Sequence, residues 1–381
     1  MPAAHFSRPA IARAVIAVLL LLLAFTACGS VPPVGGHGEA AAGEGGRDAV
    51  TVPLSQVKPL ADPKSYDGAV HAGLPDQAID PIELSPVQDL PVTVTDAQGT
   101  RVTIEDTGRI LALDIYGTLA QTVFDLGLGE DVVGRDVSTQ FAEAARLPLV
   151  TGQGHELIAE KILALDPTVI LTDTSLGPWN VILQMREAGI PVVVLPAKRS
   201  IASIGSLTER VAAALGVAAA GKRLAARTDA EVRATQASIA KVAPRTVQDK
   251  LRTIFLYVRG QSGIYYLFGD GSGAGSLIDA VGGYDVAHEI GWSGMKPVTD
   301  EAIISAQPEL ILMMTDGLAS VGGVDGLLKR LPALAQTPAG RHHRVVDMTD
   351  SAILGYGPRT PQVLNSLAVA IYAPQPSGVT K

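Results

Sequence analysis

The order of the apolar runs constrains this chain most. Two stretches that alternate between strand and helix patterns flank a stretch without any strand pattern. The first stretch runs from RILALD (109–114) to PVVVLP (191–196), and the second from TIFLYVRG (253–260) to RVVDM (344–348). Residues 201–242 between them follow helical periodicity. Such alternation predicts mostly parallel sheets covered by helices, so we expect an α/β protein with two lobes joined by one long helix.

A hairpin is expected ahead of the first lobe. The segment PVTVTDAQGTRVTIED (91–106) has two alternating apolar and polar runs around Gly99, which predicts antiparallel strands with a turn at that glycine. The apolar fraction of 47% is sufficient for the cores of two lobes. We therefore place the boundaries as follows: N-terminal lobe 91–199, interlobe helix 200–244, C-terminal lobe 245–375 and tail 376–381.

The first 27 residues have the pattern of an export signal. A basic start with Arg8 and Arg13 precedes the apolar run AVIAVLLLLLAF, which is shorter than the about 20 residues of a stable membrane span. The run ends in FTAC, which resembles a bacterial lipobox with Phe25 in place of the usual leucine. Cys28, the only cysteine of the chain, is then expected to carry a lipid. We expect an extracytoplasmic protein held at the cell membrane by this anchor; a plain thiol in a cleaved signal is the alternative.

Residues 28–90 change in character. They are rich in glycine, proline and polar residues and follow neither a strand nor a helix period, which predicts a flexible tether. Packing of the part from Thr51 to Tyr66 on the folded body stays open. The net charge of −8, with the 30 lysines and arginines scattered along the chain, argues against a nucleic-acid-binding protein.

The two lobes share a short internal repeat. The segments AEKILALDPTVIL (159–171) and DEAIISAQPELIL (300–312) align without gaps, 141 residues apart (300 − 159). Each is interpreted as a helix, a proline and a strand, and Glu160 and Glu301 occupy matching positions. Generic proline punctuation between a helix and a strand is the alternative explanation.

Three residues are candidates for a ligand site. The period of a strand places Tyr257 and Arg259 on one face with Phe255, close to the carboxyl end, where open α/β sheets bind ligands. His155 lies in a glycine-containing loop before a predicted helix, whose positive end disfavours the imidazolium. A neutral imidazole is the metal-binding form. The alternatives are a core tyrosine, a surface arginine and a loop histidine without a ligand.

With these features the chain resembles the single-helix-hinge (class III) periplasmic binding proteins, which deliver haem, ferric siderophores or cobalamin to ABC importers. The resemblance covers residues 91 to about 375. It rests on the hairpin followed by RILAL, the helix-proline-strand unit of each lobe, the long helix and FGDGSGAGSLIDAVGG. More narrowly, GHELIAEKILALDP and FLYVRG resemble segments of the haem-binding lipoproteins of the HmuT type.

This resemblance implies roles for individual residues. His155 and Tyr257 would bind the haem iron, one on each face of the macrocycle, with Arg259 beside the tyrosine. Arg359, in GYGPRTP (355–361), would pair with a haem propionate, or else only begin a helix. Glu160 and Glu301 would meet arginines on the two permease subunits; two solvated surface acids are the alternative.

The expected function is capture of ferric haem and its delivery to an ABC permease with its ATPase, for haem and iron uptake. A ferric-siderophore or cobalamin carrier of the same fold is the alternative. A haem enzyme is disfavoured, because His155 and Tyr257 on opposite faces leave the iron no open position. A lipid-anchored interaction protein without cargo is a third possibility.

Overall fold

The computed structural model describes residues 47–48, 52–74, 78–152 and 154–374. All of them belong to one contiguous unit of the chain, Ala42–Lys381. The predicted signal peptide (1–27), the predicted lipidation site Cys28 and the tail (376–381) lie outside the described residues. Within the described ranges, no helix combines the length and the apolar character needed to cross a membrane.

The N-terminal lobe is built on a parallel three-stranded sheet, as the apolar runs predict. Every residue of these strands is buried, because helices cover both faces of the sheet. Helices α1 and α4 pack on one face, and α2 and α3 on the other. In the order of the sheet, the strands are β5 (Ile110–Leu113), β6 (Val169–Thr172) and β7 (Val192–Val194). Three of the helices are α1 (Thr118–Asp125), α2 (Ala159–Ala164) and α3 (Trp179–Glu187).

The predicted hairpin is confirmed. Strands β3 (Val92–Thr95) and β4 (Arg101–Ile104) pair antiparallel, and Gly99 in the turn has a φ of 83°. Within the first alternating stretch, the run DVVGR (131–135) has the pattern of a strand but forms only isolated bridges, Val132 to Ile110 and Arg135 to Leu149. This apolar run is too short and too interrupted by glycine to form a regular strand at the edge of the sheet.

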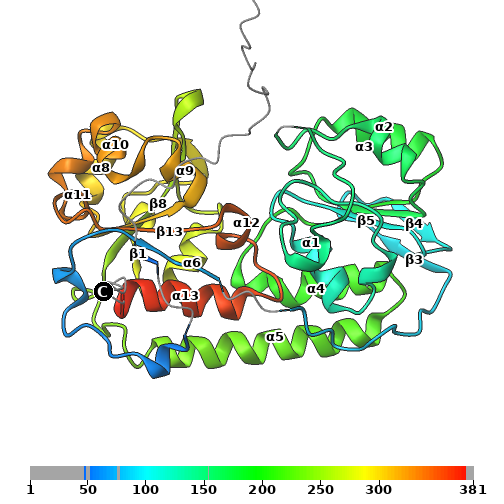
Figure 1. Cartoon of the computed structure of the whole chain (residues 1–381), viewed down its shortest axis with the longest axis horizontal. Helices are drawn as coiled ribbons and strands as arrows, with labels where there is room; N and C mark the ends of the chain where they lie inside the picture. The colour runs from blue at the N-terminus through cyan, green and yellow to red at the C-terminus, as the bar shows by residue number, and fades with distance from the viewer. Residues whose placement is uncertain (1–46, 49–51, 75–77, 153, 375–381) are drawn as a thin grey trace, which may run out of the picture. The chain divides into compact units, whose positions relative to one another are not determined.

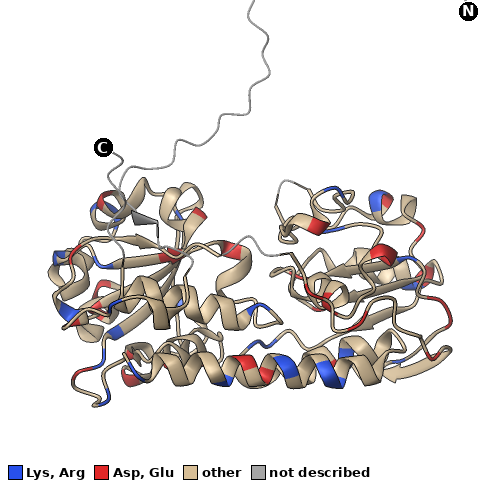
Figure 2. Cartoon of the chain, turned by 60° about the horizontal axis from the view of Figure 1, so that its bottom comes forward, with Lys and Arg blue, Asp and Glu red and all other residues tan. Residues whose placement is uncertain are grey.

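The predicted long interlobe helix is confirmed as α5, but the residues 200–244 assigned to it also contain a separate, shorter helix. Helix α4 (Ile204–Ala214) ends before Gly216, whose φ of 71° reverses the chain, and α5 (Ala218–Ile239) then runs for 22 residues, or about 33 Å. The first half of α5 contributes to the core of the N-terminal lobe, and the second half to the core of the C-terminal lobe. Figure 1 shows α5 beneath both lobes, and Figure 2 shows lysines, arginines and acidic residues along its outer surface.

The C-terminal lobe is built on a larger mixed sheet, in the order β1-β2-β13-β12-β8-β9-β11, with β10 also paired to β8. Strands β8, β12 and β13 are parallel. The sequence does not predict β9, which pairs antiparallel with β8, or β11, which pairs antiparallel with β9. The bounds are β1 (Arg47–Asp48), β2 (Val70–His71), β8 (Arg252–Arg259), β9 (Ile264–Phe268), β10 (Tyr284–Asp285), β11 (Met295–Pro297), β12 (Leu310–Met314) and β13 (Val345–Met348).

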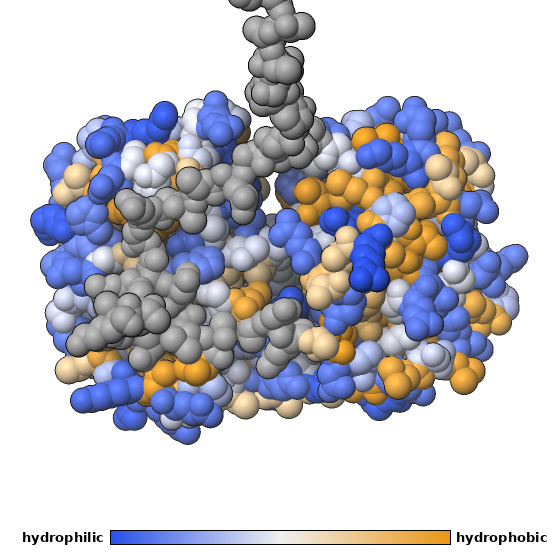
Figure 3. Space-filling model, viewed as in Figure 1, coloured by the Kyte–Doolittle hydropathy of each residue, from blue (hydrophilic) through white to orange (hydrophobic). Residues whose placement is uncertain are grey.

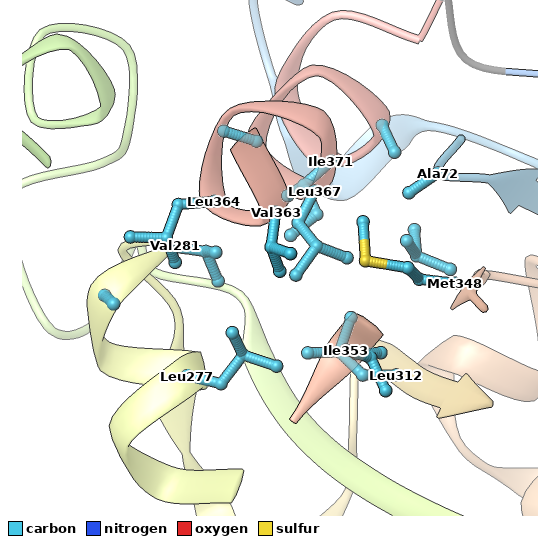
Figure 4. Close-up of a cluster of buried hydrophobic side chains, with 14 of the residues drawn as sticks. Ala72, Leu277, Val281, Leu312, Met348, Ile353, Val363, Leu364, Leu367 and Ile371 are labelled. Atoms are coloured by element: carbon cyan, nitrogen blue, oxygen red, sulfur yellow. The ribbon is translucent and has the colours of Figure 1, made fainter. Parts of the chain in front are cut away.

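Helices cover both faces of this sheet. On one face α5, α6 and α13 enclose a large apolar cluster, part of which is drawn in Figure 4. On the other face α7, α8, α10 and α11 enclose a second cluster. The bounds are α6 (Ala274–Ala280), α7 (Val286–Glu289), α8 (Asp300–Ala306), α9 (Thr315–Ala319), α10 (Gly323–Arg330), α11 (Pro338–Arg341), α12 (Asp350–Ile353) and α13 (Thr360–Tyr372).

The prediction of a flexible tether is wrong for the described residues 67–74 and 78–90, and the packing of Thr51 to Tyr66 that the sequence left open is present over the described residues 52–66. Residues 52–74 pack on the C-terminal lobe: Leu54 is buried in its core and β2 extends its sheet beside β13. Residues 78–90 follow the N-terminal lobe, where the Ile82 and Asp89 N–H groups donate to backbone carbonyls. Sequence periodicity misses this packing, because backbone hydrogen bonds and isolated apolar side chains hold these segments.

The internal repeat is also a repeat of backbone conformation. In each lobe a short helix, α2 or α8, is followed by a left-handed residue, a proline and a buried strand. The left-handed residues, Asp166 (φ 44°) and Gln307 (φ 42°), are 141 positions apart (307 − 166), as are Pro167 and Pro308. Since left-handed non-glycine residues are uncommon, their match shows that the two segments follow the same path.

Buried charges hold the loops at the carboxyl ends of β5, β6 and β7. An Arg199 guanidinium N–H donates to Asp173 at 2.8 Å and to Asp114 at 3.4 Å. Asp136 accepts hydrogen bonds from Asp114 N–H and from the backbone of the following turn. Burial raises the pKa of Asp114 to about 6 and that of Asp136 to about 7. One guanidinium thus contacts two buried carboxyls, and a third, that of Asp136, is held by backbone N–H groups beside them.

Replacing Arg199 by Met should destabilise the protein by about 3–5 kcal/mol near neutral pH, because it leaves buried carboxylates uncompensated. Because the folded-state pKa values of Asp114 and Asp136 are raised, the stability they contribute is present at low pH and is lost as pH rises toward about 7. The loss caused by Arg199→Met should therefore shrink near about pH 5 in urea unfolding. Arg223→Met, which breaks an exposed pair with Glu83, is the control and should cost at most about 1 kcal/mol. Equal losses in the two variants would contradict this.

Close packing of α4 on α5 gives a second stability prediction. A Cβ at Gly221 would lie 2.3 Å from Ala212 Cβ, whereas a Cβ at Gly205 would lie 3.8 Å from Ala225 Cβ. Gly221→Ala should lower the free energy of unfolding by about 1–3 kcal/mol through overpacking. Gly205→Ala should be neutral, or stabilising by up to about 1 kcal/mol, because alanine favours a helix. Urea unfolding measures both, and the same sign of change in both variants would refute the packing argument.

Candidate functional site

Strand β8 presents three side chains on one face, as its period predicts. Phe255 and Tyr257 both stack on Phe268 of β9, with ring centroids 5.1 Å and 5.7 Å apart. The Arg259 guanidinium lies over the Tyr257 ring, 4.6 Å from its centroid. The alternate residues Ile254, Leu256 and Val258 are buried in the opposite layer. The predicted shared face of Phe255, Tyr257 and Arg259 is confirmed.

Arg259 is held in place by Asp350. Its guanidinium donates to the Asp350 carboxylate at 2.7 Å and to its neighbour's carbonyl, that of Val258, at 3.1 Å. Asp350, the first residue of α12, also accepts from the Asp316 N–H at 3.0 Å. Burial raises the pKa of Asp350, against the lowering effects of the Asp316 N–H and Arg259. The ends of β8, β12 and β13 are thereby connected through one carboxylate.

His155 lies in the loop before α2 and is half-buried. Its Nδ1 atom is buried and has no hydrogen-bond partner among the described residues. The pKa of His155 is lowered, first by burial and then by the positive charge of Arg259, while Glu156 and Asp350 act in the opposite direction. The neutral imidazole agrees with the sequence-based expectation, but its cause does not: α2 begins only at Ala159.

Two of the charges that alter the pKa of His155 belong to the other lobe. His155 belongs to the N-terminal lobe, and Arg259 and Asp350 belong to the C-terminal lobe. Because the charges of Arg259 and Asp350 act on His155, the structure brings the histidine loop near the end of β8. Tyr257 lies directly beneath the Arg259 guanidinium, so three of the predicted site residues gather in one region.

Tyr116 and Asp350 are neighbours of this region that the sequence analysis missed. Tyr116 follows β5 and packs against the apolar cluster of the C-terminal lobe, to which Tyr257 also belongs. Burial raises the pKa of the Tyr116 phenol, with Tyr257 among the lesser contributors. Both missed residues come within three positions of the end of a buried strand, and that position is the signal that could have identified them.

A cavity of about 270 Å³ adjoins the site and is lined by residues of both lobes. Neither His155 nor Tyr257 lines it, but Ser351 and Ala352 do, and these directly follow Asp350. Arg359, which precedes α13, also faces the cavity. At its lining, the Thr118 hydroxyl donates to the Gly355 carbonyl at 2.6 Å and joins the lobes. Arg359 is thus next to the region of His155 and Tyr257 rather than within it.

The remaining predicted residues lie elsewhere. Glu160 on α2 and Glu301 on α8 are exposed on the surface, one in each lobe. Cys28 lies outside the described residues. The described part of the chain also contains no group of three or more histidine, cysteine, aspartate or glutamate side chains arranged to hold a metal ion.

Comparison with known proteins identifies relatives that are similar in sequence over much of this chain. One is a cobalamin-binding protein of Halobacterium salinarum, 30% identical over 232 residues, 58% of this chain and 58% of that protein's own length. Another is an uncharacterised ABC transporter substrate-binding lipoprotein, YvrC, of Bacillus subtilis, 25% identical over 74% of this chain and 86% of that protein.

A solved structure is more similar in sequence. The crystal structure of the heme binding protein HmuT has a TM-score of 0.77 and is 38% identical, covering 82% of this chain and 100% of that one. Other structures of HmuT carry alanine in place of one arginine, one tyrosine and one histidine. The family model described as periplasmic binding protein matches residues 115–352, more than half of the sequence and most of both lobes. This chain therefore belongs to the periplasmic binding protein family.

Proposed function

We propose that this protein captures ferric haem between its lobes and delivers it to an ABC permease with its ATPase. The observation that carries the proposal is the gathering of His155 and Tyr257, from different lobes, around the charge of Arg259. Imidazole and phenolate are both ligands of haem iron. The similarity to HmuT supports this cargo, and the tyrosine and arginine replaced in HmuT are two positions apart, as Tyr257 and Arg259 are.

Each residue has a chemical role in this proposal. A neutral His155 offers a nitrogen lone pair without first losing a proton. Tyr257 would supply a phenolate oxygen, a hard anionic ligand that favours the ferric state, and the Arg259 guanidinium lies beside its ring. Arg359, at the adjoining cavity, is our candidate partner for a propionate. With both axial positions of the iron filled by protein, the arrangement suits carriage rather than catalysis.

Cobalamin is the second candidate cargo, because one relative is named a cobalamin-binding protein. A corrinoid carrier would not need the His155 and Tyr257 pair on opposite lobes. The visible absorption spectrum of protein prepared with haem or with cobalamin distinguishes the two cargoes.

Membrane attachment and docking complete the proposal. Export through the signal peptide would leave Cys28 lipidated at the outer side of the cell membrane, and a related protein is named a lipoprotein. Glu160 and Glu301 would contact basic residues of the permease. Both lie on short helices whose opposite side is anchored in the core by Ile162 or Ile303, so the carboxylates face outward.

Removing either proposed ligand should change the haem spectrum. Tyr257→Phe keeps the stacking on Phe268 but removes the oxygen ligand, so the charge-transfer band of a tyrosinate should disappear. His155→Ala should shift the Soret band. Tyr266→Phe, directly opposite Tyr257 on β9, is the matched control and should leave the spectrum of the parent. If both Tyr257→Phe and His155→Ala showed the haem spectrum of the parent, the assignment of these residues as iron ligands would be wrong.

Removal of its charge tests the role of Arg259. The guanidinium lies 4.6 Å from the centroid of the Tyr257 ring, so Arg259→Ala removes the cation beside the proposed anionic ligand. The variant should bind ferric haem more weakly than the parent and lose part of the tyrosinate charge-transfer band. Arg252→Ala, at the other end of the same strand and paired with Glu289, is the control and should keep the affinity and spectrum of the parent. A parent-like affinity and spectrum of Arg259→Ala would remove Arg259 from the site.

A further inference from the structure

Two exposed aliphatic side chains occupy matching positions of the internal repeat. Leu163 on α2 is 39% exposed and Ile304 on α8 is 38% exposed. They are 141 residues apart (304 − 163), the same offset that relates Glu160 to Glu301. Each aliphatic residue comes three positions after its glutamate, so glutamate and aliphatic residue are neighbours on one helix face. Each lobe therefore displays a carboxylate beside an apolar side chain.

This match is not explained by the fold. Buried positions of a repeat stay alike because both cores must be filled, as with Ile162 and Ile303. Exposed positions carry no such requirement. Three pairs of equivalent positions are exposed in both helices, and they hold glutamate with glutamate, leucine with isoleucine, and alanine with serine. Retention of the acid and the aliphatic residue at the surface indicates a shared contact outside the chain.

Single exposed apolar residues are ordinary on a protein surface, so exposure alone does not distinguish Leu163 and Ile304 from other exposed hydrophobic residues. Seven large hydrophobic residues are exposed in the described part of the chain, and Leu163 with Ile304 is the only pair separated by the offset of the repeat. In Figure 3 hydrophobic residues gather over part of the N-terminal lobe in this view. The seven are Leu84, Val87, Leu163, Leu183, Val247, Met295 and Ile304.

We propose that Leu163 and Ile304 are the apolar contacts of one docking surface with two equivalent halves, completed by Glu160 and Glu301. Its occupant is a partner built from two equivalent chains, each presenting a basic residue next to an apolar recess. This rests on the proposed delivery of haem to a permease, which would be that partner. The equal spacing of carboxylate and aliphatic group in the two halves supports a partner with two equivalent chains, and each carboxylate calls for a basic residue opposite it.

The carboxylates and the aliphatic side chains contribute differently to docking. The carboxylates act over distance, speed the encounter and orient it, and salt screens their effect. The aliphatic groups act only after water has been expelled from the contact, and low concentrations of salt barely alter that contribution. Salt dependence therefore separates the apolar contribution from the electrostatic one.

The experiment measures the affinity of the haem-loaded protein for the haem permease–ATPase complex of the same organism, purified in nanodiscs. The double variant Leu163→Ala, Ile304→Ala should bind about tenfold more weakly at both low and high salt. Glu160→Gln, Glu301→Gln should lose more at low salt than at high salt. Val87→Ala, Val247→Ala removes two other exposed aliphatic side chains and should bind as the parent does.

Several outcomes overturn the proposal: parent affinity of the Leu163 and Ile304 variant, an equal loss in the Val87 and Val247 control, a loss that disappears at high salt, or self-association of the parent through these residues. Alanine suits a helix, and haem spectra and melting temperatures check that each variant folds. Leu163→Gln, Ile304→Gln is the second variant and should show the same loss. If the parent takes up no haem, the proposed cargo fails, while binding of the haem-free protein to the nanodiscs still tests the surface.

Discussion

Burial of one helix in two separate cores is the constraint on which the arrangement depends. Ala220 and Leu224 of α5 belong to the core of the N-terminal lobe, and Val232 and Ile239 belong to that of the C-terminal lobe. A continuous helix transmits position along its length, because every turn is fixed by its own hydrogen bonds. The loops at the carboxyl ends of the two sheets are therefore held in register, although they belong to lobes with separate cores.

The site joins these lobes through charge rather than through packing alone. Arg259 contacts the ring of Tyr257 and the carboxylate of Asp350, and its field reaches His155 in the other lobe. A change of charge at any member of this group alters the electrostatic environment of the others. The proposed iron ligands thus belong to one electrostatic unit, although they are supplied by segments about a hundred residues apart in sequence.

Periodicity predicts whatever depends on one strand or helix. The central parallel strands of both sheets, the hairpin and the shared face of Tyr257 and Arg259 follow from it, whereas the added strands β9 and β11 do not. Periodicity does not predict features that depend on which elements become neighbours. Asp350, which follows β13, reaches Arg259 at the end of β8 because both strands pair with β12. The break between α4 and α5 follows from the positive φ of Gly216, a single residue that changes no period, and the packing of residues 52–74 is set by tertiary contacts that leave no period in the sequence.

The packed N-terminal segment is a second covalent connection between the lobes. Leu74 packs against the core of the C-terminal lobe, while the Ile79 N–H donates to Glu143 of the N-terminal lobe. Five residues of fully extended chain span at most about 18 Å. As long as both attachments hold, the distance between these two points cannot exceed that limit. This connection therefore sets an upper bound on how far these two points of the lobes can move apart, whatever bending α5 permits.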